Sequence, residues 1–102
     1  MKTKIKTDAA YLDVIAGYHV PVINVTGPAS ALVGRRLAEG HPFAACYRDT
    51  AEGREFTLYS DMNGLDVNVI AQRFKGGGEA NRAMFRIPKP NSYIDYFIKE
   101  VL

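Results

Sequence analysis

Apolar and polar positions change their period several times along the chain, which predicts short strands and helices in alternation. Apolar residues at every second position, bounded by Gly, Pro, Asn or Asp, indicate strands, and apolar residues at three- and four-residue spacing indicate helices. Strands are predicted over 11–16, 19–25, 43–49, 54–60 and 84–87. Helices are predicted over 30–39, 67–74 and 92–102, the last an amphipathic C-terminal helix. A short helix over 8–14 competes with the first strand.

Turn and cap residues mark the ends of these elements. Gly17 predicts a tight turn between the first two strands, and Gly40 is a plausible C-cap for the helix before it. Asp66 is a good N-cap for the helix over 67–74. Pro21 lacks an N–H, so it predicts a second strand that lies at an edge or begins there.

Three consecutive glycines, Gly76, Gly77 and Gly78, separate a helical pattern from a strand pattern. Glycine runs are costly to order and often occur where the backbone takes unusual dihedral angles or approaches a ligand. Several residues over 79–84 are good helix formers, which predicts a short helix after the glycines. A glycine loop before a helix N-terminus offers free N–H groups that suit a phosphate. A flexible turn is the alternative interpretation.

These patterns together predict one domain over 1–102. Strands and helices alternate throughout, with no internal repeat or low-complexity segment. We expect an α/β (α+β) domain with a mixed sheet of about five strands flanked by three or four helices.

Composition narrows the functional classes. The chain has 102 residues, 47% of them hydrophobic, and a net charge of +2, which is too small to argue for a nucleic-acid binder by itself. Positive residues nevertheless cluster around the glycines in the sequence. The segment 73–89 contains Arg73, Lys75, Arg82, Arg86 and Lys89, and its single acidic residue is Glu79. No apolar run is long enough for a membrane span or a signal peptide, so we expect a cytoplasmic protein.

No residue pattern in the sequence indicates a particular reaction. Cys46 is the single cysteine, so no internal disulfide is possible, and no Cys or His set has the spacing of a zinc site. His19 and His41 have no Ser or Cys partner suggested by spacing. The glycines lack the Gly-Lys-Ser/Thr of a P-loop and follow a helix rather than a strand. We therefore expect no catalytic residue, metal ligand or cofactor in this chain.

From about residue 17 to 87 the chain resembles the DHHA1 domain, the C-terminal domain of DHH-family phosphoesterases such as RecJ-like, nanoRNase-like and exopolyphosphatase-like proteins. The glycine stretch followed by Phe85 is the most specific match. The other matching segments are Val20-Pro21-Val22-Ile23-Asn24, Ala29-Ser30-Ala31-Leu32-Val33-Gly34, Gly40-His41-Pro42-Phe43-Ala44, Leu58-Tyr59-Ser60, Gly64-Leu65-Asp66-Val67 and Ile70-Ala71.

The resemblance implies a substrate-binding role. In that family the DHHA1 domain caps a DHH domain that holds two divalent metals, usually manganese, and its glycine loop helps to bind a phosphate or nucleotide. The implied substrate surface comprises Gly76, Gly77, Gly78, Glu79, Asn81, Arg82 and Ser60, with Asn24 and Ser30 as further candidates. The implied partners are a DHH catalytic domain in trans and a short oligonucleotide, a nucleotide or another phosphorylated ligand.

The sequence departs from the family at the loop. There is no Asp-His-His sequence, so we expect no phosphodiester hydrolysis by this chain alone. Glu79 stands where the family has histidine, Arg82 and Met84 replace Ala and Gly, and Tyr59 stands where an arginine often precedes the serine. A carboxylate at a helix start competes with a phosphate, so we expect phosphate binding to be weakened or lost unless Arg82 restores the positive charge.

Two functional hypotheses follow. The first is a phosphate- or nucleic-acid-binding domain of a DHH-type phosphoesterase, non-catalytic on its own. The alternative is a non-catalytic protein-interaction or oligomerisation module with a degenerate ligand loop. It uses Tyr93, Tyr96 and Phe97 of the C-terminal helix for self-association or for binding a protein partner.

Overall fold

The computed structural model of the chain describes residues 9–88, and the predicted helix over 92–102 lies outside them. The described residues contain six strands and two helices. The strands are β1 (Tyr11–Ile15), β2 (Tyr18–Asn24), β3 (Ala44–Thr50), β4 (Gly53–Tyr59), β5 (Gly77–Glu79) and β6 (Arg82–Pro88). The helices are α1 (Ala29–Ala38) and α2 (Val67–Gln72).

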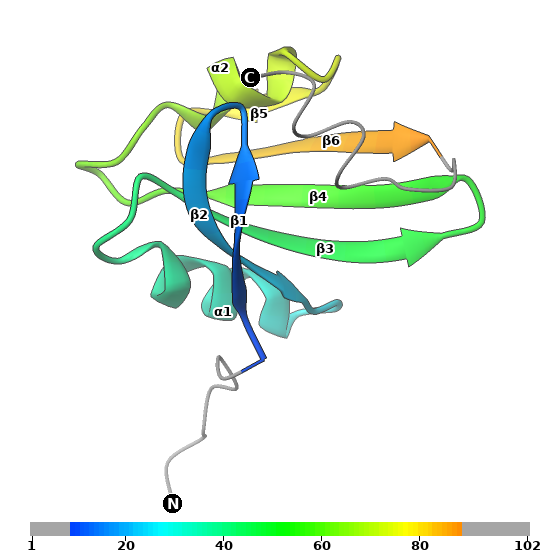
Figure 1. Ribbon diagram of the computed structural model, residues 1–102, viewed down its shortest axis with the longest axis horizontal. Helices are drawn as coiled ribbons and strands as arrows, with labels where there is room; N and C mark the ends of the chain where they lie inside the picture. Colours follow the sequence, from blue (N-terminus) through cyan, green and yellow to red (C-terminus); the bar gives the residue numbers. More distant parts are fainter. Residues whose placement is uncertain (1–8, 89–102) are drawn as a thin grey trace, which may run out of the picture.

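The strands form one mixed sheet in the order β1-β2-β3-β4-β6-β5. Strands β2 and β3 are parallel and are connected through α1, and the other neighbouring strands are antiparallel. Helix α1 lies on one side of the sheet and α2 on the other (Figure 1). The expected α+β class with a mixed sheet is confirmed, with six strands instead of about five.

Each face of the sheet carries its own core, because successive side chains of a strand point to opposite faces. The larger core lies under α2 and includes Val22, Leu58 and Phe85. The smaller core lies under α1 and consists of Ile23, Val33, Cys46 and Tyr59. We call these two sides the α2 face and the α1 face.

The predicted short helix after the glycines is wrong. Residues 77–79 and 82–88 instead form a hairpin, with Ala80 and Asn81 as its two-residue turn. Strand β6 pairs with β4 over seven positions, and its side chains alternate regularly between exposed and buried. This long-range pairing outweighs the local helix propensity of residues 79–84. The helix considered over 8–14 is also wrong, since residues from Tyr11 onwards pair with β2.

Several end signals are confirmed. Asp66 caps α2, its carboxylate accepting a hydrogen bond from the Asn68 N–H at 3.0 Å. Gly40 has a φ of 78° just past α1, and the His41 N–H donates to the Ala38 carbonyl at 3.0 Å. The expectation from Pro21 is wrong, because β2 begins at Tyr18 and lies between β1 and β3. The ladder of β2 with β3 begins at Val22, so the missing N–H of Pro21 removes no bond to β3. Neither helix in the range 9–88 has the length and apolar composition to cross a bilayer.

Candidate functional site

Two of the expected site residues meet where β4 ends beside the tip of the β5–β6 hairpin. Asn81 Nδ2 donates to Ser60 Oγ at 3.0 Å and to the Asp61 carbonyl at 2.9 Å. The Ser60 N–H donates to the Asn81 carbonyl at 3.1 Å. Ser60 is only 5% exposed, and the bond from Asn81 Nδ2 supplies a donor to its buried hydroxyl oxygen.

The hairpin turn is also tied to the start of α2. The Ala80 carbonyl accepts hydrogen bonds from the Val67 N–H at 2.8 Å and from Ser60 Oγ at 3.2 Å. The turn therefore joins the end of β4, the start of α2 and the two hairpin strands at one point. These bonds hold the backbone of the turn in place and orient the side chains of Ser60 and Asn81.

A cavity of about 370 Å³ opens at this junction. It is lined by Arg35, Glu39, Ser60, Asp61, Met62 and Asn81. We call it the hairpin-tip cavity. Its lining has one cation, Arg35, against the carboxylates of Glu39 and Asp61, so an anionic ligand gains no net attraction from these charges.

The three glycines do not form a loop before a helix. The Gly76 N–H donates to the Ala71 carbonyl at 2.9 Å, and the Gly78 N–H donates to Asn68 Oδ1 at 3.0 Å. Gly77 pairs with Met84 in the β5–β6 ladder. Two of the N–H groups that were expected to cradle a phosphate are thus used inside the chain. A direct ligand contact of these glycines stays a prediction.

Close packing explains two of the three glycines. A Cβ atom at Gly76 would overlap the Met84 carbonyl and the Phe85 side chain. Gly78 has a φ of 156°, and a Cβ atom there would lie 2.6 Å from the Arg82 carbonyl oxygen. At Gly77 the nearest atom to such a Cβ would be Asn68 Oδ1 at 3.4 Å, which is an ordinary contact. The glycines thus allow β5 to lie tightly against β6.

Arg82, another expected site residue, points to a different place from Ser60. It lies opposite Tyr59 in the β4–β6 ladder and is exposed on the α1 face. There it lines a second cavity of about 330 Å³, which also contains Ser30. We call this the α1-face cavity. Glu79 lies opposite Arg82 across the hairpin turn, and Asn24 lies at the end of β2. Neither Glu79 nor Asn24 lines either cavity.

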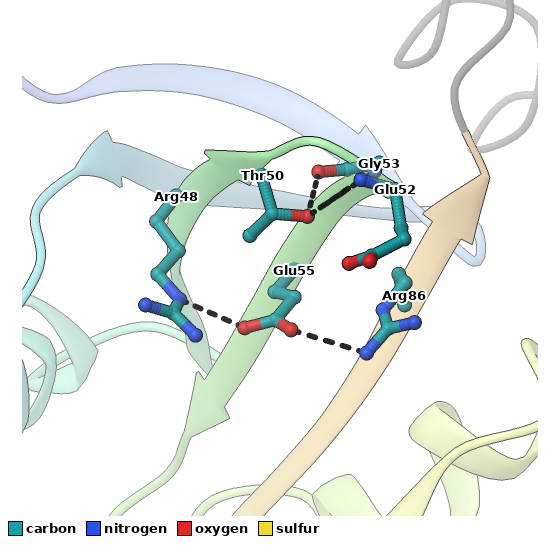
Figure 2. Close-up of polar contacts among 6 residues, drawn as sticks. All are labelled: Arg48, Thr50, Glu52, Gly53, Glu55 and Arg86. Carbon is teal, nitrogen blue, oxygen red and sulfur yellow. Dashed lines mark hydrogen bonds and ion pairs between the residues drawn. The ribbon is translucent and has the colours of Figure 1, made fainter.

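An ion-pair network lies along the α1 face beside this cavity (Figure 2). Glu55 on β4 accepts hydrogen bonds from Arg48 Nε at 2.8 Å and from Arg86 at 3.3 Å. The hydrogen bond from Arg48 is the largest cause of the lowered pKa of Glu55. Thr50 closes the adjacent β3–β4 turn, its hydroxyl donating to the Gly53 carbonyl at 2.9 Å. The network therefore spans three adjacent strands, β3, β4 and β6.

Cys46, His19 and His41 are the other reactive side chains among residues 9–88 that the sequence brings into question. Cys46 is buried beneath α1, its thiol donating to the Ser30 carbonyl at 3.6 Å, and burial raises its pKa to about 11. His19 and His41 line neither cavity. In the range 9–88 no three His, Cys, Asp or Glu residues come close enough to hold a metal ion.

Arg48, Glu55 and Thr57 also line the α1-face cavity, although they were not among the expected site residues. The sequence contains one indication of them, the period-two alternation of β4, which places residues 55, 57 and 59 on one face of the strand. Recognising the cavity also required the sheet order, because β3 and β6 both flank β4.

Comparison with known proteins gives a likeness of fold alone. No protein-family model and no curated protein matches the chain. A solved structure, the crystal structure of an uncharacterized protein from Helicobacter pylori G27, superposes with a TM-score of 0.57 at 23% sequence identity. The match covers 93% of this chain and 27% of the other, so this chain spans about a quarter of the length of that protein. The α+β fold described above is therefore also found within a longer chain.

Proposed function

We propose that the chain is a substrate-binding domain of the DHHA1 type, which acts with a DHH catalytic domain on phosphodiester or phosphate ester substrates. The domain is non-catalytic on its own and works in the cytoplasm. It presents a phosphorylated ligand, such as a nucleotide or a short oligonucleotide, to metals that the partner domain holds. The two divalent metals, with manganese the expected ion, belong to that partner and not to this chain.

The observation that carries the proposal is the hydrogen-bonded contact between Ser60 and Asn81 at the hairpin-tip cavity. These residues are 21 positions apart, and both belong to the substrate surface that the DHHA1 resemblance implies. Their contact supports a common site for residues that sequence similarity alone grouped together. The cavity volume of about 370 Å³ lies within the roughly 300–1,000 Å³ range of small-ligand sites.

Reconstitution with a separate DHH domain tests the proposal. The 102-residue chain is mixed with a purified DHH domain and Mn²⁺, and hydrolysis of 5′-phosphorylated dithymidine is followed. We expect hydrolysis to rise well above that of the DHH domain alone, and Asn81→Ala to reduce the gain. An exposed substitution outside both cavities, Val69→Ala, is the matched control. No gain at saturating concentrations of the chain would argue against the proposal.

A second candidate is a protein-interaction module with a degenerate ligand loop. It is favoured by the internal hydrogen bonds of Gly76 and Gly78, which leave the glycine run without its expected role. It is also favoured by the exposure of Tyr11 and Leu12 on β1, an edge strand. Sedimentation of the full chain distinguishes the candidates, because this candidate, in its self-associating form, predicts a dimer or larger assembly. A monomer over the micromolar range excludes that form.

A further inference from the structure

The α1-face cavity has the cationic and hydroxyl side chains that a small anion-binding site needs. It lies between the β2–α1 loop, the start of α1 and the α1 face of strands β3, β4 and β6. The lining is Val25, Thr26, Gly27, Pro28, Ser30, Ala31, Cys46, Tyr47, Arg48, Glu55, Thr57, Tyr59, Arg82 and Met84. Two of these side chains are cationic and one is a carboxylate, in contrast to the hairpin-tip cavity.

The register of three strands fixes how the charged groups are arranged. On the α1 face, Arg82 lies beside Tyr59, and Thr57 lies between Cys46 and Met84. Two positions before Thr57 on β4, Glu55 lies between Arg48 and Arg86. Thr57 is thus the central position, with cations on both sides along the strand direction. A ligand seated over Thr57 has Arg82 at one end and Arg48 at the other.

The two cations differ in how they are held. Arg48 is bonded to Glu55 at 2.8 Å, so its guanidinium is oriented but partly neutralised. Arg82 makes no side-chain hydrogen bond or ion pair with any residue in the range 9–88, including the Glu79 opposite it. Arg82 therefore keeps its donors available for a ligand, and an arginine fork suits a phosphate group.

The uncharged residues that line the cavity suit the part of such a ligand that carries no phosphate. Apolar groups of Val25, Pro28, Ala31 and Met84 line the cavity next to the hydroxyl-bearing Thr26 and Thr57. Met84 is 41% exposed, so its side chain is accessible to a ligand in the cavity. The volume of about 330 Å³ is near the lower end of small-ligand sites and matches a ligand of about mononucleotide size.

From this arrangement we infer that the α1-face cavity binds the phosphate of a ligand of about mononucleotide size, with Arg82 as the main phosphate contact and Arg48, oriented by Glu55, as the second. The inference places the phosphate on the α1 face of the sheet and not in the glycine run. It rests on the proposed function for the class of ligand and on the cavity for its location.

The test is an NMR titration of the full chain with two probes, inorganic pyrophosphate and 5′-phosphorylated dithymidine. We expect both probes to shift the amide resonances of Thr57 and Arg82, and Arg82→Gln to weaken binding by at least about tenfold. Arg36→Gln removes the same charge from an exposed site on α1 that lines neither cavity, and we expect it to change the affinity less than about twofold. Arg48→Gln should have an intermediate effect.

The outcomes separate this inference from the proposed function. Shifts at Ser60 and Asn81 without shifts at Thr57 overturn the inference and leave the proposed function standing. Shifts at Thr57 with pyrophosphate but not with the dinucleotide keep the anion site and contradict a nucleotide ligand. Equal weakening by Arg82→Gln and Arg36→Gln shows attraction by net charge alone and overturns the inference. No shift with either probe at millimolar concentration overturns both.

Discussion

Gly34 in α1 lies against the ring of Tyr59 in β4, with no room for a Cβ atom between them. Tyr59 is 1% exposed and belongs to the smaller core, so its ring cannot move aside into solvent. The glycine therefore sets how closely the helix approaches the sheet. Through this contact, the helix position determines the shape of both cavities, since α1 residues line each of them.

Gly34→Ala should destabilise the fold despite the better helix propensity of alanine. Overpacking typically costs about 1–3 kcal/mol, and the propensity gain returns about 1 kcal/mol. We expect a net loss of up to about 2 kcal/mol in the free energy of unfolding, measured by urea denaturation. In a Tyr59→Leu background the same substitution should cost less or become favourable. An equal cost in both backgrounds would mean that the ring is not the cause.

Gly76→Ala should be far more damaging than Gly77→Ala. A Cβ atom at Gly76 meets the Met84 carbonyl, whereas at Gly77 it makes only an ordinary contact with Asn68. We expect Gly76→Ala to lose about 2 kcal/mol or more and Gly77→Ala to stay within about 1 kcal/mol of the parent, by thermal or urea unfolding. If both variants lose stability equally, strand packing does not explain the glycine run.

Asn81→Ala removes two hydrogen bonds and leaves Ser60 with one fewer partner. Each net hydrogen bond contributes about 1 kcal/mol, so we expect a loss of about 1–2 kcal/mol. Ser60→Ala should lose a similar amount, and the double variant should lose less than the sum because the two residues share one bond. Additive losses in this double-mutant cycle would contradict the coupling.

Cys46 should react slowly with thiol reagents in the folded protein. Its thiol is 1% exposed and its pKa is raised to about 11, so at pH 8 roughly one thousandth of it is thiolate. We expect labelling by iodoacetamide to be slow at pH 8 and to become fast in denaturant. Rapid labelling without denaturant would show that α1 opens readily from the sheet.

Glu55 should make stability depend on acid pH. Its ordinary pKa is 4.5 and is lowered in the fold, so the unfolded chain binds the proton more tightly. The stabilising contribution is therefore fully present above pH 4.5 and is lost as the pH falls through the lower folded value. We expect Glu55→Gln to flatten this part of the pH–stability curve. An unchanged curve would show that the contacts with Arg48 and Arg86 contribute nothing measurable in solution.

The parts of the fold that local chemistry determines were predictable. Asp66 at the start of α2 and Gly40 after α1 act through their own backbone neighbours, so their caps are visible in the sequence. The β5–β6 hairpin was missed because residues 79–84 favour a helix locally. Their strand conformation depends on pairing with β4, which lies about 25 positions earlier in the chain.

The candidate site was predictable only in part for the same reason. Ser60 and Asn81 were grouped by resemblance and do lie in contact. The neighbours of Arg82 on the α1 face belong to β3 and β4, and their proximity follows from the strand order of the sheet. A charge pattern along one strand contains no information on which strands lie beside it.

The single parallel pair of the described sheet has a consequence for the order of folding. Strands β1–β2, β3–β4 and β5–β6 are each joined by a short turn, so their pairing closes small loops. Pairing of β2 with β3 closes a longer loop that contains α1, and pairing of β4 with β6 closes a longer loop that contains α2, each with a larger entropic penalty. We expect these two long-range pairings, and not the hairpins, to limit the folding rate. Substitutions at the contacts that α1 and α2 make with the sheet should then slow folding.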